Sequence, residues 1–171
     1  MSPTEKPRTL VVYYSRSGNT RRVAEEIATV IGAELEEIIE DTGRSGLLGY
    51  LRSGRDALLH RLPSIGRSKH DPAKFDLVII GTPVWTSSVA APVRTWLVQN
   101  AHTLGRVAFF VTHGGTGSKR TFRQMEQLGE VEPMATLAVR EHELKTGEWL
   151  PPTQQFAAAF SRLPAPELTS T

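Results

Sequence analysis

Apolar residues gather in short runs along this chain, and polar segments rich in glycine and hydroxyl side chains separate the runs. The most apolar runs cover residues 9–14, 75–81, 107–112 and 134–139. Continuous apolar runs of this length are typical of strands buried on both faces of a parallel sheet. A weaker alternation over Ala33–Ile39 indicates another strand, more exposed and nearer an edge. The pattern therefore predicts five strands.

Between these strands, apolar residues recur at helical spacing. This periodicity predicts five helices, over about 21–31, over 46–61, from Pro92 onward, over about 118–128, and around 156–163. Gly32 and Gly129 supply the C-terminal stops of two of them. Strands that alternate with helices predict an α/β fold in which helices cover both faces of a parallel sheet. A doubly wound order of 2-1-3-4-5 is expected for the five strands.

The length of 171 residues suits a single domain over 1–171. About residues 1–7 and 164–171 are expected to form flexible tails. The segment from Glu141 to Pro152 has no clear assignment. It either caps a crevice or forms a contact surface.

Three polar loops follow the carboxyl ends of predicted strands. They cover residues 15–20, 82–88 and 113–118 and follow the first, third and fourth strands. In open α/β sheets, ligands bind outside the carboxyl ends of the strands, at the point where the strand order reverses. We therefore expect these three loops to border one crevice.

The first loop, Ser15-Arg16-Ser17-Gly18-Asn19-Thr20, has the composition of an anion-binding turn. Its hydroxyl groups and main-chain N–H groups can converge on a phosphate at the positive end of the following helix. The alternative is an ordinary strand-to-helix turn in which Asn19 or Ser17 caps the helix.

Composition removes several classes of function. Cysteine is absent, which excludes disulfides, thiolate metal sites and cysteine nucleophiles. No two of the five histidines have the i, i+4 spacing of a helical metal pair, so we expect no metal site. A net charge of +2 is too small to indicate nucleic-acid binding. No apolar run has the length of a membrane span or a signal core, so a cytoplasmic protein is expected.

At this point the three loops resemble those of the flavodoxin-like FMN-binding family, over about Thr9 to Phe160. Residues 15–20 resemble its phosphate signature, Gly81-Thr82-Pro83-Val84-Trp85 its first flavin loop, and Thr112-His113-Gly114-Gly115-Thr116-Gly117 its second. The resemblance implies a flavodoxin-like sandwich and the cofactor FMN. The implied FMN-binding residues are Ser15, Arg16, Ser17, Gly18, Asn19, Thr20, Thr82, Pro83, Val84, Trp85, Thr86, Thr112, His113, Gly114, Gly115 and Gly117.

Several of these residues keep a second interpretation. Trp85 either stacks on the flavin or is a core or interface aromatic. His113 is either a solvated loop residue or a group that donates to, or carries protons near, the flavin. Gly114 and Gly115 either admit the flavin or serve only a turn. An arginine-rich stretch over 44–69 is either a solvated face or a docking patch.

Competing nucleotide motifs do not fit. The run Gly117-Ser118-Lys119 lacks the adjacent Gly-Lys of an NTPase loop, and no Gly-x-Gly-x-x-Gly follows the first strand.

The chain departs from typical flavodoxins in three respects. It is mildly basic, it lacks an aromatic residue in 113–118, and no glycine follows Trp85. Two hypotheses remain. The first is an FMN-binding carrier that passes electrons from a reductase to another protein. The alternative is an NAD(P)H-dependent FMN or quinone reductase that uses bound FMN. No nicotinamide site is recognisable, which favours the first. The complete phosphate loop argues against a fold that has lost its ligand.

Overall fold

The sheet has the strand order expected from the sequence. A computed structural model describes residues 6–41 and 62–163. Its parallel strands run in the order β2-β1-β3-β5-β6. Their bounds are β1 Thr9–Tyr13, β2 Glu34–Glu37, β3 Leu77–Trp85, β5 Val107–His113 and β6 Pro133–Arg140. The order 2-1-3-4-5 is thereby confirmed, because the numbering differs only through β4, Ser88–Val89, a short strand paired with β3 alone.

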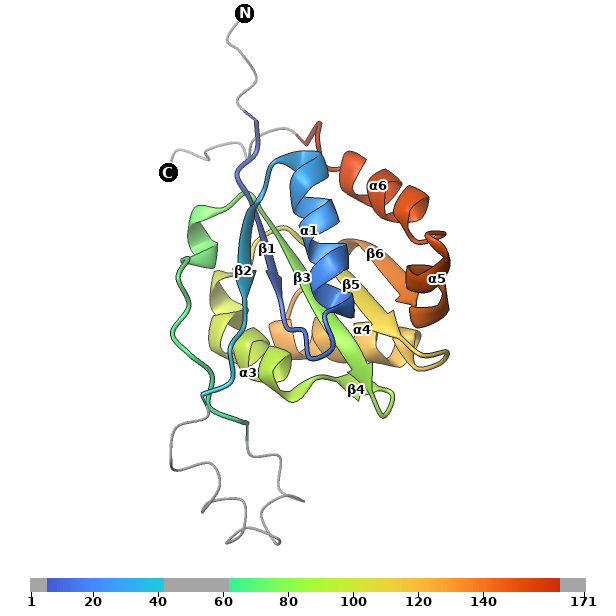
Figure 1. Ribbon diagram of the computed structural model, residues 1–171. Helices are drawn as coiled ribbons and strands as arrows, with labels where there is room; N and C mark the ends of the chain where they lie inside the picture. Colours follow the sequence, from blue (N-terminus) through green and yellow to red (C-terminus); the bar gives the residue numbers. More distant parts are fainter. Residues whose placement is uncertain (1–5, 42–61, 164–171) are drawn as a thin grey trace, which may run out of the picture.

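Helices cover both faces of this sheet (Figure 1). One face packs against α1, Asn19–Ile31, and α6, Leu150–Ala158. The other packs against α3, Ala91–Asn100, and α4, Ser118–Gly129. Three short helical segments complete the described residues: η2 Pro72–Lys74, η3 Ala101–Thr103 and α5 Glu141–Thr146. The flavodoxin-like architecture is confirmed. None of the helices in the described ranges is long and apolar enough to cross a membrane.

The predicted loop over 82–88 is wrong in its first half. Strand β3 continues through Trp85 and turns back into β4, with Trp85 opposite Ser88. The two turn residues, Thr86 and Ser87, have φ of 50° and 58°. A two-residue turn with two positive φ angles matches the right-handed twist of a hairpin, and it is usually built from glycine or asparagine. Because positions 86 and 87 hold neither glycine nor asparagine, no local motif marks this hairpin.

The C-terminal helices also differ from expectation. The segment without an assignment contains α5 and the start of α6, so the last helix begins at Leu150 rather than near Phe156. Pro7, placed in the expected N-terminal tail, is buried. The predicted helix over 46–61 and the tail over 164–171 lie outside the described residues.

Candidate functional site

The three polar loops meet at the carboxyl end of the sheet. Tyr14, at the end of β1, packs edge-on against Trp85 with ring centroids 5.5 Å apart. The hydroxyl groups of Thr20 and Thr112 lie 2.8 Å apart, which joins the start of α1 to the end of β5. Between the second and third loops, a Cβ placed on Gly117 would lie 2.7 Å from the Cα of Ser87. The three loops that were expected to border one crevice therefore adjoin one another.

The first loop leaves the N-terminus of α1 without a side-chain cap. Gly18 is the N-cap residue, with φ of 89°, and no side chain accepts a hydrogen bond from the first turn. The interpretation that Asn19 or Ser17 caps the helix is thus wrong. The loop is folded onto itself, since the main-chain N–H of Gly18 donates to Ser15 Oγ at 3.1 Å. Main-chain donors in the first turn of a helix have no intrahelical partner and suit an anion.

The side chains of this loop have different surroundings. Arg16 and Ser17 are exposed, and Ser15 and Asn19 are half-buried. Thr20 is buried and bonded to Thr112, which is itself buried. Thr20 and Thr112 therefore hold the first and third loops together.

In the second loop, Thr82 supports the hairpin from inside. Its side chain is buried, its hydroxyl donates to the carbonyl of Pro83 at 2.9 Å, and it accepts from the N–H of Ala90 at 3.1 Å. These two bonds engage the Thr82 hydroxyl within the hairpin, and its contact with FMN stays a prediction. The neighbouring Pro83, Val84 and Trp85 are half-buried, and Thr86 is exposed.

Trp85 has two partners, one just before the first loop and one within it. Besides Tyr14, it meets Arg16, whose guanidinium carbon lies 5.9 Å from the ring centroid. Tyr14 in turn donates its hydroxyl proton to Glu40 Oε1 at 2.9 Å. Burial, followed by the hydrogen bond to Glu40, raises the pKa of Tyr14 to about 12. Tyr14 is therefore a neutral donor that fixes the edge of Trp85.

Sequence reasoning missed Tyr14 as part of the site. The signal was available, because Tyr14 ends a strand that lies beside the strand of Trp85 in the predicted order.

It also missed a polar network under the hairpin. Ser88 Oγ donates to Gln124 Oε1 at 2.9 Å and accepts from the guanidinium of Arg94 at 3.0 Å. The N–H of Val89 donates to the same Gln124 oxygen at 3.1 Å. This network ties the hairpin to α3 and α4. No motif in the sequence marks it, because its members lie on three separate elements.

The third loop contains glycines with different roles. Gly117 has φ of 93° and touches Ser87, so both its backbone angle and its packing require glycine. Gly114 and Gly115 are exposed, neither has a positive φ, and nothing lies within 4 Å of a Cβ placed on them. The fold of the described residues gives no reason for glycine at these two positions.

His113 is buried, so its interpretation as a solvated loop residue is wrong. Its side chain is 6% exposed, and its Nδ1 has no hydrogen-bond partner among the described residues. Burial, and next the charge of Arg140 beside it, lowers the pKa of His113. The imidazole is therefore neutral near pH 7 and offers an unused polar atom at the carboxyl end of β5.

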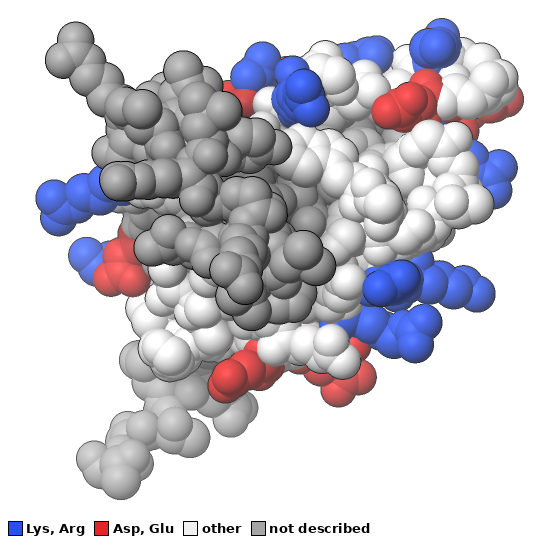
Figure 2. Space-filling model, turned by 90° about the horizontal axis from the view of Figure 1, so that it is seen from below, with Lys and Arg blue, Asp and Glu red and all other residues white. Residues whose placement is uncertain are grey.

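The surface around the loops is partly basic. Seen from below the molecule of Figure 1, uncharged residues occupy much of the face that is not grey, and Lys and Arg lie in separate groups around its margins, with Asp and Glu among them (Figure 2). The described residues contain no group of three or more His, Cys, Asp or Glu side chains placed to hold a metal ion.

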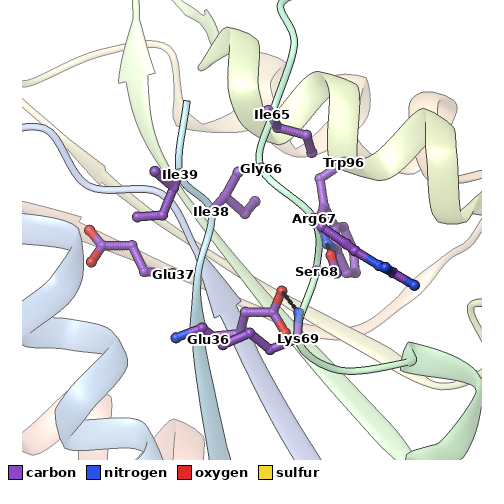
Figure 3. A pocket seen from close by; sticks show the side chains of 10 residues that line it. All are labelled: Glu36, Glu37, Ile38, Ile39, Ile65, Gly66, Arg67, Ser68, Lys69 and Trp96. Carbon is purple, nitrogen blue, oxygen red and sulfur yellow. Dashed lines mark hydrogen bonds between the residues drawn. The ribbon is translucent and has the colours of Figure 1, made fainter. Parts of the chain in front are cut away.

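A separate pocket lies at the edge of the sheet and shares no residue with the three loops (Figure 3). It lies between β2, the segment 65–69 and Trp96, and its volume is about 40 Å³. That is room for about one or two water molecules. Its neighbour Glu36 faces Lys69, whose N–H donates to the carboxylate at 3.1 Å. This pocket is too small for a flavin.

Comparison with known proteins agrees with the fold. A flavoprotein in complex with FMN from Lactobacillus acidophilus NCFM is 28% identical, with a TM-score of 0.65, over 84% of this chain and 98% of that chain. A flavodoxin, WrbA-like protein from Agrobacterium tumefaciens is 16% identical, with a TM-score of 0.59, over 91% of this chain and 95% of that one. The second likeness concerns the fold alone.

No curated protein matches this sequence. The family described as Flavodoxin matches residues 8–141, which is more than half of the 171 residues. The chain therefore belongs to the flavodoxin family.

Proposed function

We propose that this chain binds FMN with its phosphate at the N-terminus of α1 and its ring between the second and third loops. The observation that carries the proposal is the first turn of α1, which has no side-chain cap and is joined to the end of β5 by the hydrogen bond between Thr20 and Thr112. A phosphate carries about two negative charges and accepts several hydrogen bonds. It would supply the cap that the chain itself does not provide to this helix.

Other residues of the second and third loops fit the remaining parts of FMN. Trp85 is half-buried and held edge-on by Tyr14, so it offers an aromatic face of fixed orientation. Gly114 and Gly115 leave space for main-chain N–H groups to approach a polar ring edge. The 28% identical flavoprotein from Lactobacillus acidophilus was crystallised with FMN, which further supports this choice of ligand.

Bound FMN would supply electron-transfer chemistry, and we propose that the chain carries electrons from a reductase to an acceptor protein. The chain's own residues would bind the phosphate, orient the ring and limit access of water. The alternative is a reductase that takes hydride directly from NAD(P)H. One observation favours that alternative: the third loop is exposed at residues 114–116 and has no aromatic side chain to cover the ring.

The binding test is titration of the purified chain with FMN, followed by flavin fluorescence and absorbance. Saturable one-to-one binding is expected, and a chain that leaves FMN unchanged would refute the proposal. Anaerobic stopped-flow mixing of the FMN complex with NADPH then separates the two functions. Slow bleaching supports the carrier, and rapid bleaching without a reductase supports the enzyme.

A further inference from the structure

Helix α4 carries its charges in two separate halves. Its first two turns hold the exposed cations Lys119, Arg120 and Arg123. Its end and the residues just beyond hold Glu126, Glu130 and Glu132. No salt bridge joins any of these side chains to another group among the described residues. Cations at a helix N-terminus and anions at its C-terminus oppose the helix dipole, so this arrangement is unfavourable within one chain.

The neighbouring strand β6 is an edge with one uncovered face. Within the described residues β6 pairs with β5 only. Its side chains alternate, with Leu137 and Val139 buried toward α6, while Met134, Thr136 and Ala138 are exposed on the opposite face. Met134 is 49% exposed. An edge strand of eight residues without an internal charge is a template for pairing with another strand.

We infer that a second copy of this chain docks at this edge about a two-fold axis, with the two β6 strands antiparallel. In a two-fold interface the same surface patch of both copies is used. If one residue contacts a second residue of the other copy, the second contacts the first in return. Centred on Thr136, the pairing sets Glu132 of one copy opposite Arg140 of the other. It also sets Met134 opposite Ala138 on the same face, so these two side chains pack side by side across the new strand pair.

The same axis also brings opposite charges of α4 together. The two α4 helices then lie antiparallel, with Met125 of one copy level with Met125 of the other. Met125 is midway between Arg120 and Glu130, so the basic half of one helix lies beside the acidic half of the other. The two centres lie at comparable distances from the turn that joins α4 to β6. Met125 is four residues, about 6 Å, from the end of α4, and Thr136 is three residues, about 10 Å, from the start of β6. One axis therefore satisfies both elements.

A shallow, open depression lies beside these side chains. It has a volume of about 410 Å³ and is lined by Glu126, Gln127, Glu130, Val131 and Glu132. It lies where α4 ends and the chain enters β6, so the arginines of the second copy would lie against an acidic surface.

The test is the association state of the full chain, measured by sedimentation equilibrium over a wide range of concentration. The wild type should form a dimer. Arg120→Glu and Glu130→Arg should each weaken dimerisation about tenfold, because each creates two like-charge contacts per dimer. The double variant should restore dimerisation. Positions 120 and 130 lie about 15 Å apart along one helix, so they cannot pair within one copy.

Lys74→Glu is the matched control for Arg120→Glu, since Lys74 is exposed on η2 and its reversal changes the net charge by the same amount. It should leave dimerisation unchanged, and circular dichroism checks that every variant is folded. A wild-type chain that stays monomeric overturns the inference. So does a double variant that dimerises no better than the single variants. Both results are independent of FMN, so they leave the proposed function untouched.

Discussion

Ser17 is the exposed hydroxyl closest in sequence to the uncapped turn of α1, and it has no hydrogen bond within the described residues. If the FMN phosphate lies at this turn, Ser17 is free to donate to it. Ser17→Ala should then weaken FMN binding by about 1–3 kcal/mol, the usual value of a hydrogen bond to a charged group. Isothermal titration of both proteins with FMN measures the difference.

Thr29→Ala provides the control for this experiment. Thr29 lies on the same helix and donates its hydroxyl proton to the carbonyl of Glu25 at 2.8 Å, far from the first turn. Its loss should leave FMN affinity unchanged. Equal affinities of the Ser17→Ala variant and the wild type would place the phosphate elsewhere.

His113 should make the stability of the protein depend on pH. Burial lowers its pKa in the folded state, so the unfolded chain binds this proton more readily. Stability is therefore undiminished above the ordinary pKa of about 6.5 and falls as the pH drops below it, until the folded pKa is passed. Urea unfolding between about pH 5 and pH 8 measures this loss.

His113→Gln removes the titrating group and should reduce that loss on the acid side. The other histidines contribute equally to both proteins, so they cancel in the difference. An identical pH dependence of the two proteins would mean that the buried imidazole takes up its proton as readily as in the unfolded chain.

At the scale of elements, β2 is held to the chain that precedes η2 by one buried carboxylate. Glu36 is 5% exposed and accepts the N–H groups of Lys69 and His70 at 3.1 and 2.9 Å. His70 Nδ1 also lies 2.7 Å from it. Glu36→Ala would leave these donors without a partner and should lower the free energy of unfolding by roughly 3 kcal/mol.

Glu34 offers the comparison on the same strand. It also contacts His70, at 3.0 Å, but its side chain is 49% exposed. Glu34→Ala should cost less than about 1 kcal/mol, because water replaces an exposed ion pair. Chemical denaturation of both variants tests the contrast, which fails if Glu34→Ala is the more damaging change.

The regular elements were predictable because their signals are local. The apolar runs of β1 and β5 predict strands from their own residues. The glycine after α1 predicts the end of that helix in the same way. The meeting of the three loops was predictable from the strand order, because loops that follow neighbouring parallel strands lie at the same edge of the sheet. The β3–β4 hairpin was not predictable, since Thr86 and Ser87 are held at positive φ by tertiary contacts. These include the bonds that Gln124 of α4 makes to Ser88 and Val89.

The site residues divide in the same way. Gly18 and Gly117 were predicted to bind FMN. Both have positive φ at the start of a helix, so the backbone conformation alone explains why these residues are glycines. Thr82 was predicted to contact FMN, which stays a prediction. Its buried hydroxyl also holds the hairpin, through a contact between residues eight apart that no motif specifies. Gly114 and Gly115 are different, because neither backbone angle nor packing requires them. Where the fold does not explain a glycine, a ligand is the stronger explanation.

For the whole molecule, the proposed ligand would bridge three loops that belong to separate strands. FMN should therefore stabilise the folded chain as one unit. At a hundredfold excess over the dissociation constant, binding contributes about 2.7 kcal/mol, which raises the melting temperature of a chain of this size by roughly 5–10 °C. Differential scanning fluorimetry at several FMN concentrations measures the shift.

Riboflavin separates the two ends of the site, because it keeps the ring and lacks the phosphate. It should give a clearly smaller shift than FMN at equal concentration, and Ser17→Ala should reduce the FMN shift while leaving the riboflavin shift unchanged. That combination assigns the phosphate to α1. If riboflavin stabilises the chain as strongly as FMN, the first turn of α1 contributes nothing to binding, and the ring contacts near Trp85 alone hold the ligand.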